Sequence, residues 1–286
     1  MKFFKLKNAL LAAAIFVGCA VFIWWQNNDV TVSACDYSSP RVGTAFDGFR
    51  IVQLSDLHNK TFGAGQKRLL AAVESLRPDA IFITGDLIDS NIEGTENARA
   101  LVNGLLGLAP LYYVTGNHES RAGKYADLLV FLKQSGVTVL DGEKVVLERE
   151  GQSVELLGVG DLEFDKQYAS DAEALARMED KLRALCADGD AFRILLSHRP
   201  ELIDLYAGFG IDLVFTGHAH GGQWRLPLVG GLYAPDQGLF PQYTAGAYVR
   251  GDTTEYVSRG LGNSIFPVRL FNRPEVVCVT LHTART

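Results

Sequence analysis

The sequence predicts a single α/β domain that is built around two β-sheets. Short apolar runs alternate with segments whose apolar residues follow a helical spacing, as at Leu69, Leu70, Val73 and Leu76. The middle of the chain breaks this alternation, because strand-like runs at 137–140, 144–150 and 153–159 are joined by Asp-Gly and Glu-Gly turns. Antiparallel strands between two regions of alternating strands and helices favour one domain with two sheets.

The remaining elements follow from the same local patterns. Short apolar runs predict further strands at 49–54, 79–84, 110–115, 192–196, 212–215 and 276–281. Helical spacing predicts helices at 65–76, 96–106, 124–134, 171–187 and 201–206. The segment 224–256 is rich in Gly, Pro and Tyr, and we expect it to shape a pocket. Its tyrosines either line that pocket or pack within a hairpin: Tyr233, Tyr243, Tyr248 and Tyr256.

Composition excludes several classes of protein. Of the 286 residues, 48% are apolar and 21% are charged, so the chain is not of the disordered class. The net charge of -6 argues against nucleic-acid binding, which needs a clustered positive field. No two cysteines form a CxxC pair, so a cysteine-based zinc site is not expected. We expect the cysteines in the core, without a disulfide framework: Cys19, Cys35, Cys186 and Cys278.

The N-terminus predicts a membrane anchor over 1–26. Three lysines precede an apolar run, Ala9 to Trp25, that is close to the shortest length able to span a bilayer. Trp24 and Trp25 stand at its end, where interfacial aromatic residues are expected. The lysines should stay in the cytoplasm, which leaves the rest of the chain outside the cell membrane.

The division of the rest of the chain follows from this interpretation. Residues 27–47 are polar and are expected to form a linker, and 48–286 the catalytic domain. A cleaved signal peptide and a lipoprotein signal remain alternatives to the anchor. The segments 16–19 and 32–35 both loosely resemble lipoprotein cleavage sites.

Potential metal ligands follow the ends of five predicted strands, which is where ligands bind in open α/β sheets. The candidate ligands are two Asp, one Asn and four His: Asp56, His58, Asp86, Asn117, His198, His218 and His220. The third motif, Gly116-Asn117-His118-Glu119, adds His118 beside them. Oxygen ligands combined with imidazole suit Zn, Mn or Fe rather than Ca. Each motif alone is equally consistent with a turn or a core histidine. His282 has no such motif around it, and we expect it to be structural.

These residues, in this order, resemble the calcineurin-like metallophosphoesterase superfamily, whose pattern is D-x-H, G-D, G-N-H-[DE], H and G-H-x-H. The resemblance covers about 49–281 and implies a four-layer αββα sandwich with two mixed sheets. It also implies two divalent metal ions. One would be held by Asp56, His58 and His220, the other by Asn117, His198 and His218. Asp86 would bridge both, and His118 would contact substrate without being a ligand.

Further segments resemble membrane-anchored bacterial phosphodiesterases of this superfamily: 49–58, 218–223 and 269–275. Two such metals lead to the hypothesis that a hydroxide held between them attacks a phosphodiester or pyrophosphate. His118 would stabilise charge on the phosphoryl oxygens and could protonate the leaving oxygen. The membrane anchor favours a lipid or envelope-linked phosphate ester. Phosphomonoesterase and nucleotide phosphodiesterase activities remain alternatives, as does a non-catalytic, metal-stabilised extracellular domain. A binuclear amidohydrolase is disfavoured, because D-x-H here comes first and H-x-H last.

Three more residues stand beside these motifs. Glu119 could orient neighbouring groups or serve as an ordinary structural carboxylate. Arg199 and Arg269 could touch a substrate phosphate, but we expect both to be structural.

Overall fold

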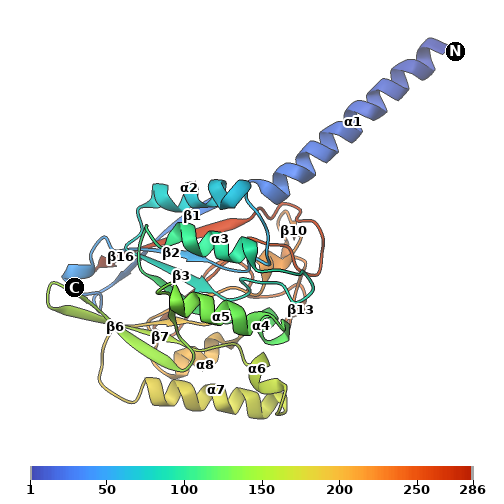
Figure 1. Ribbon diagram of the computed structural model, residues 1–286. Helices are drawn as coiled ribbons and strands as arrows, with labels where there is room; N and C mark the ends of the chain where they lie inside the picture. The colour runs from blue at the N-terminus through green and yellow to red at the C-terminus, as the bar shows by residue number, and fades with distance from the viewer. Residues whose placement is uncertain (1, 285–286) are drawn as a thin grey trace.

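Two six-stranded β-sheets packed face to face form the centre of the protein, and helices cover both outer faces (Figure 1). The structure is a computed structural model and describes residues 2–284. Between the sheets, alternate residues of both sets of strands form one apolar core, in which the rings of Phe82 and Phe215 lie 5.3 Å apart. The predicted four-layer sandwich with two mixed sheets is confirmed.

The first sheet has the strand order β1-β16-β2-β3-β4-β5. Strands β2 to β5 are mutually parallel, β16 runs antiparallel to β2, and β1 runs parallel to β16. The bounds are β1 (Thr31–Ser39), β2 (Arg50–Leu54), β3 (Ala80–Thr84), β4 (Leu111–Val114), β5 (Thr138–Val139) and β16 (Glu275–Thr283).

The second sheet has the order β14-β15-β9-β8-β7-β6, with four parallel central strands and antiparallel edges. Its strands are β6 (Glu143–Arg149), β7 (Gln152–Gly158), β8 (Arg193–Leu196), β9 (Leu213–Thr216), β14 (Gly246–Arg250) and β15 (Thr253–Val257). Two small ribbons follow β9: β10 (Arg225–Leu226) with β11 (Gly230–Gly231), and β12 (Tyr233–Ala234) with β13 (Gly238–Leu239).

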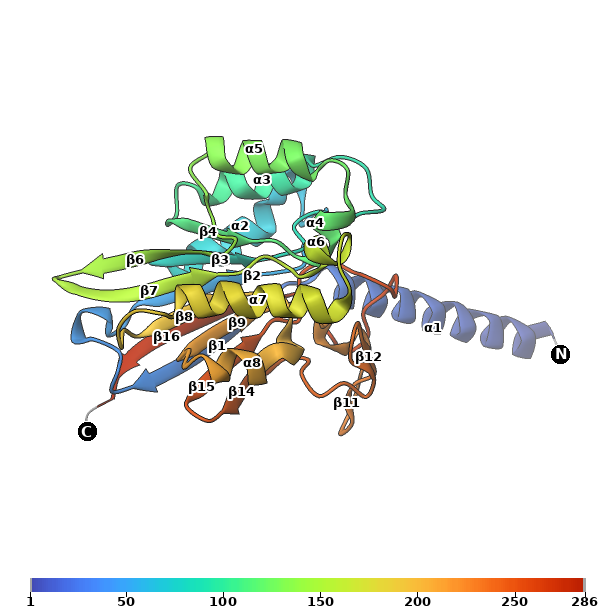
Figure 2. The same ribbon diagram turned by 90° about the horizontal axis from the view of Figure 1, so that it is seen from below.

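The helices pack through apolar stripes on the outer sheet faces (Figure 2). The first sheet is covered by α2 (Lys67–Leu76), α3 (Glu96–Leu105) and α5 (Tyr125–Gln134), and the second by α7 (Asp171–Leu185) and α8 (Ile203–Gly208). Short helices α4 (Asn117–Arg121) and α6 (Glu163–Lys166) and the single-turn helices η1 (Thr44–Phe46), η2 (Ala64–Gln66), η3 (Pro200–Leu202) and η4 (His220–Gly222) lie in the connections.

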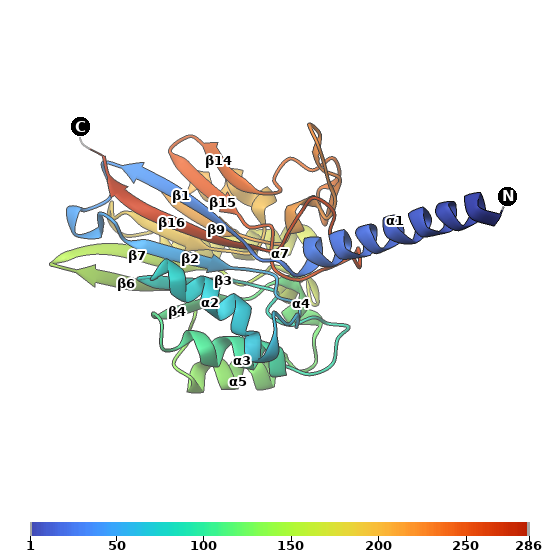
Figure 3. The same ribbon diagram turned by 90° about the horizontal axis from the view of Figure 1, so that it is seen from above.

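The segment 27–47 is not the linker that its polar composition predicts, because it contains β1. This strand pairs with β16 along its whole length, from Thr31 with Glu275 to Ser39 with Thr283 (Figure 3). An edge strand pairs with its neighbour through the backbone, and only one of its faces needs to pack against the core. Strand β1 accordingly alternates between half-buried and exposed residues. Its sequence is therefore too polar for an apolar-run signal. Cleavage before Cys35 would remove four residues from this ladder, which argues against the second lipoprotein site.

One other expectation, about the middle of the chain, needs correction, and one alternative near its end can be decided. Strand β5 does not join an antiparallel group with β6 and β7, because it lies parallel to β4 at the edge of the first sheet. The Tyr-rich segment contains the hairpin β14–β15, in which Tyr256 stacks on Phe215 and Tyr248 meets the ring of Tyr243 edge-on. These contacts favour the packing alternative for those tyrosines.

Helix α1 (Lys2–Asn28) projects from the domain at one end of the sheets (Figures 1 and 3). Its segment Leu6–Asn28 has a mean hydropathy of 2.1 and is, by length and composition, able to cross a membrane. Only Asp29 and Val30 separate α1 from β1. The domain is therefore joined to this helix almost directly.

Candidate metal centre

The carboxyl ends of strands from both sheets meet at one edge of the sandwich, and the five motifs meet there. Strands β2, β3 and β4 bring the motifs of the first sheet, and β8 and β9 bring those of the second. The loops interlock: the backbone N–H of Asp56 donates to Gly85 O, and that of His218 donates to the carboxylate of Asp56. All eight side chains predicted from the sequence are brought together.

A first group of potential ligand atoms comprises Asp56, His58, Asp86 and His220, all within 4.8 Å of one another. The Nε2 atoms of His58 and His220 are 3.0 Å apart. His220 Nε2 lies 3.4 Å from a carboxylate oxygen of Asp56, and His58 Nε2 lies 3.5 Å from one of Asp86. The four side chains are almost completely buried. A cation with oxygen and imidazole ligands fits this arrangement.

A second group comprises Asp86, His198 and His218, with Asn117 beside it. His198 Nε2 lies 3.3 Å from the same Asp86 oxygen, Oδ2, that faces His58. It also lies 3.2 Å from His218 Nδ1 and 3.3 Å from Asn117 Oδ1. One carboxylate therefore faces both groups, as a ligand bridging two ions must.

The histidines and carboxylates of the site shift one another's pKa. Burial lowers the pKa of His198 and of His58, but Asp86 outweighs it and raises the pKa of His198 to about 10, and Asp89 raises that of His58, so a bound cation takes the place of their protons. Burial, with the nearby His58 and Arg269, holds the pKa of His220 well below its usual range, so its imidazole is neutral and keeps a free lone pair. Burial opposes ionisation of Asp86, but His198 and His58 together hold its pKa well below the usual range. Neutral imidazole and ionised carboxylate are the forms that bind metals.

Backbone conformation sets these residues apart. Asp56, His58, Asp86, His218 and His220 all have positive φ, between 48° and 64°. Such left-handed conformations cost L-residues on the order of 1–3 kcal/mol each and concentrate at functional sites. The surrounding fold must hold all five in place, which indicates that the position of each side chain matters more here than local stability.

The motif glycines are needed mainly for space. Gly85 has a φ of +90°, a conformation that glycine adopts without strain. Gly116 has an extended φ of -103°, and a Cβ on it would collide with the carboxylate and backbone of Asp86. A Cβ on Gly217 would collide with Ser55 and Asp56. These two glycines let loops from neighbouring strands approach closely enough for their ligands to meet.

This close approach makes Gly116→Ala a sensitive test. We expect the variant to lose about 1–3 kcal/mol of unfolding free energy, because the added methyl group pushes Asp86 away. Its thermal midpoint should fall by several degrees and its metal content should drop. Gly123→Ala is the matched control, since a Cβ there meets no atom within 4 Å. Equal melting temperatures for the two variants would contradict the packing argument.

Three of the four histidines are oriented by a second partner on the ring nitrogen that faces away from the centre. His58 Nδ1 donates to Asp89 at 3.0 Å, and His198 Nδ1 donates to Thr84 O at 2.8 Å. His218 Nε2 donates to Asp236 at 2.9 Å. Because carboxylate and carbonyl oxygens only accept, each contact fixes the tautomer and leaves a lone pair facing the centre.

Asp89 and Asp236 were missed in the sequence. Asp89 stands three residues after Asp86, so its position beside the motif was an available signal. Asp236 lies in the irregular segment after β12, where no pattern marks it. It also accepts from Arg199 at 2.5 Å, and Arg199 is held in turn by Asp161 at 2.8 Å.

Removing the Asp236 carboxylate should weaken the metal centre without removing a ligand. We expect Asp236→Ala to lower metal affinity about 10- to 100-fold, because His218 loses the acceptor that fixes its tautomer. Asp236→Asn retains an oxygen acceptor and should recover most of the affinity. Competition with a metallochromic chelator measures both. Equal affinity in Asp236→Ala and wild type would show that His218 needs no such partner.

Glu119 organises the loops rather than binding substrate. Its carboxylate accepts from the backbone N–H groups of Gly116, Asp86, Leu87 and Ile88 at 2.7–3.2 Å. It is fully buried and tied to the two loops that carry Asp86 and Asn117. Of the two interpretations left open, the geometry supports orientation of neighbouring groups.

His118 differs from the other motif histidines in its surroundings. Its side chain is 13% exposed, whereas those of the four histidines in the ligand groups are at most 3% exposed. Its Nδ1 accepts from the backbone N–H of Ser90 at 3.2 Å, and its ring meets that of His58 edge-on at 4.5 Å. It stands at the rim of the site and is the motif histidine most open to a substrate.

The two arginines are structural, as expected. Arg199 is buried in ion pairs with Asp161 and Asp236. Arg269 is buried against the backbone carbonyls of Gly262 and Arg259, and its Nη2 lies 3.3 Å from His220 Nδ1. His282, in β16, pairs with Asp36 and Asp47 instead of joining the site.

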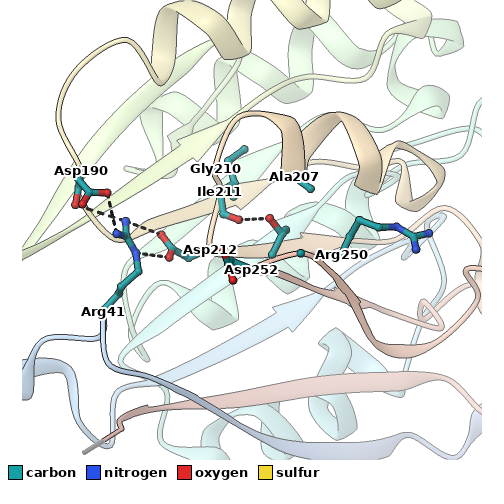
Figure 4. A pocket seen from close by; sticks show the side chains of 10 residues that line it. Arg41, Asp190, Ala207, Gly210, Ile211, Asp212, Arg250 and Asp252 are labelled. Carbon is teal, nitrogen blue, oxygen red and sulfur yellow. Dashed lines mark hydrogen bonds and ion pairs between the residues drawn. The ribbon is translucent and has the colours of Figure 1, made fainter. Parts of the chain in front are cut away.

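A separate hollow lies at the opposite end of the second sheet (Figure 4). Its walls include Asp212 and Thr253, which stand at the beginnings of β9 and β15, whereas the motif residues follow the strand ends. Arg41 crosses it and is paired with Asp190 at 2.8 Å and Asp212 at 2.6 Å. These ion pairs tie the end of β1 to the second sheet.

Comparison with known proteins agrees with the site. Residues 49–222 match the family of calcineurin-like phosphoesterases, and the chain belongs to this family. It is 32% identical to "Uncharacterized metallophosphoesterase YkuE" of Bacillus subtilis (strain 168), over 82% of this chain and 80% of that protein. It is 31% identical to "Phosphodiesterase YaeI" of Escherichia coli (strain K12), over 82% of each chain. The chain is thus a metal-dependent phosphoester hydrolase.

Two further likenesses are informative about architecture. A "Transmembrane protein with metallophosphoesterase domain" of Bos taurus is 31% identical, over 85% of this chain and 55% of that protein. The crystal structure of phosphopantetheinyl hydrolase from Mycobacterium tuberculosis superposes with a TM-score of 0.50 at 15% identity, covering 76% of this chain and 91% of that one. The latter likeness is one of fold.

Proposed function

We propose that this protein hydrolyses a phosphodiester or pyrophosphate at a centre of two divalent metal ions. The observation that carries the proposal is Asp86, whose Oδ2 faces His58 at 3.5 Å and His198 at 3.3 Å. Asp56, His58 and His220 would hold one ion, and Asn117, His198 and His218 the other. The ions would be Mn, Zn or Fe, since the ligand atoms are carboxylate or amide oxygens and imidazole nitrogens.

The bound ions supply two things in such a centre: polarised phosphoryl oxygens and a water acidic enough to act as nucleophile near neutral pH. The chain provides the geometry. Tautomers fixed by Asp89, Thr84 and Asp236 keep the imidazole lone pairs aimed at the centre before any substrate arrives. Preorganised groups of this kind need no rearrangement during the reaction.

His118 is placed to hold a proton for the leaving group. Its Nδ1 accepts from Ser90 N–H, so in the neutral ring the proton is on Nε2. Burial lowers the pKa of His118, which favours the neutral ring near pH 7. Nε2–H can then donate to a phosphoryl or leaving oxygen at the rim of the site.

The remaining features favour a phosphodiester substrate that lies near a membrane. One relative is named a phosphodiesterase and another a transmembrane protein, and α1 is able to cross a membrane. We propose that α1 anchors the protein by a single pass, with Lys2, Lys5 and Lys7 in the cytoplasm and the catalytic domain outside. A lipid or envelope-linked phosphate ester would then be concentrated near the site.

Activity and metal content measured together test this function. The purified full chain, supplied with Mn or Zn, should bind about two ions and cleave bis-p-nitrophenyl phosphate faster than p-nitrophenyl phosphate. Faster cleavage of the monoester would favour the phosphomonoesterase alternative. Two bound metals with no cleavage of either compound under any ion would favour the non-catalytic, metal-stabilised domain.

A further inference from the structure

The base of α1 is fixed to the catalytic domain by several contacts. Asn27 Oδ1 accepts from the backbone N–H of Arg269 at 2.7 Å, and Asn27 O accepts from Lys60 Nζ at 2.5 Å. The guanidinium of Arg273 lies 4.9 Å from the ring of Trp25. With only two residues between α1 and β1, the domain has a defined orientation relative to this helix.

Apolar side chains are exposed at the end of the domain from which α1 emerges. The ribbons β10–β11 and β12–β13 lie at that end, and β6 lies at the far end (Figures 2 and 3). The exposed residues on these ribbons and on the segment before β16 are Leu228, Val229, Leu239, Phe240, Ile265 and Phe271. The ring of Phe271 packs 5.7 Å from that of Phe22 on α1, so this surface is continuous with the apolar helix.

Two hollows meet at Phe271. One, of about 240 Å³, is lined by Gln26, Thr31, Arg259, Phe271 and Arg273, and therefore presents two guanidinium groups. The other, of about 500 Å³, runs along Leu226 to Gly230, with Arg225 at its side. The guanidinium groups of the smaller hollow also pair with Glu275 and Asp29, at 3.5 and 2.5 Å. Two arginines next to an apolar groove, both beside a membrane helix, match the headgroup and acyl chain of an anionic lipid.

We propose that this surface docks onto the bilayer leaflet from which α1 emerges to join the domain. The tips of β10–β11 and β12–β13 and the segment around Phe271 enter the interface, and the hollow between Arg259 and Arg273 takes an anionic phospholipid headgroup. The metal centre lies directly beneath, because β11 contacts η4, the turn that carries His220, and Arg269 joins Asn27 to His220. The substrate would then be a phosphoester within that leaflet. The proposal rests on the membrane anchor proposed above.

The test uses the full chain in vesicles whose phosphatidylcholine and phosphatidylglycerol carry brominated acyl chains, which quench nearby tryptophan. Val229→Trp and Val146→Trp form a matched pair, because the two valines are 57% and 51% exposed, and the first lies in the turn of the β10–β11 ribbon whereas the second lies on β6. Docking predicts that the fluorescence added at 229 is largely lost, while that added at 146 is retained. Equal fluorescence from the two positions would overturn the docking surface.

The headgroup hollow has its own readout in the same vesicles. Quenching at 229 should weaken when phosphatidylglycerol is omitted, and Arg259→Gln should abolish this dependence on anionic lipid. Quenching that is independent of lipid charge would overturn the headgroup assignment. Flotation with the vesicles reports whether α1 is inserted, and cleavage of soluble bis-p-nitrophenyl phosphate by Val229→Trp reports whether the metal centre works. Flotation, diester cleavage and quenching therefore distinguish failure of the anchor, of the proposed function and of the docking surface.

Discussion

Asp86→Asn is expected to abolish most of the activity and to reduce metal binding. Asparagine retains the oxygen that accepts the His118 backbone N–H at 2.8 Å, so the loop should keep its shape. The other carboxylate oxygen, which faces His58 and His198, is replaced by an amide nitrogen that cannot bind a cation. Losing a bridging ligand removes several kcal/mol of transition-state stabilisation, so kcat/KM should fall at least about 10³-fold.

Metal analysis and diester kinetics on the same preparation check this result. Asp127→Asn is the matched control, because Asp127 is an exposed carboxylate on α5 and makes the same change in charge far from the centre. A far-ultraviolet circular dichroism spectrum that matches wild type excludes global unfolding as the cause. An Asp86→Asn protein with its full metal complement and normal turnover would refute the bridging role.

The grouping of the candidate ligands was predictable because each of them is marked by a local sequence motif. Each of Asp56, Asp86, Asn117, His198 and His218 follows a strand closely, and parallel strands deliver such residues to one edge of a sheet. The sequence therefore predicted that these side chains lie close together. It did not show why the motif glycines are present, because the collision that excludes a Cβ at Gly116 involves Asp86, which lies on another loop.

The features that escaped prediction depend on contacts between distant segments. Asp236 binds His218 from a segment without periodicity, so no local pattern marks it. Strand β1 is held by pairing with β16 at the other end of the chain, and its alternating polar residues resemble those of a linker. The bond between Asn27 and Arg269 likewise joins residues 242 positions apart. Local patterns do not specify such long-range contacts.

His118→Asn should separate catalysis from metal binding. We expect the variant to keep its metals, because the side chain lies at the rim and its contact to Asp86 is through the backbone N–H. Its kcat should fall about 10²- to 10⁴-fold, the range typical for loss of a general acid. His282→Asn is the control, since His282 is a histidine outside the site. Loss of metal in His118→Asn would instead make His118 a ligand, together with His58 and Asp89, which lie within 4.8 Å of it.

Substrates with different leaving groups distinguish two roles for His118: protonation of the leaving oxygen and stabilisation of charge on the phosphoryl oxygens. A nitrophenolate leaves readily without protonation, whereas an alkoxide needs a proton as the bond to phosphorus breaks. If Nε2–H protonates the leaving oxygen, the defect of His118→Asn should be much larger for a diester that expels an alkoxide than for bis-p-nitrophenyl phosphate. If Nε2–H only stabilises charge on the phosphoryl oxygens, both substrates should lose activity equally, because that charge develops with either leaving group.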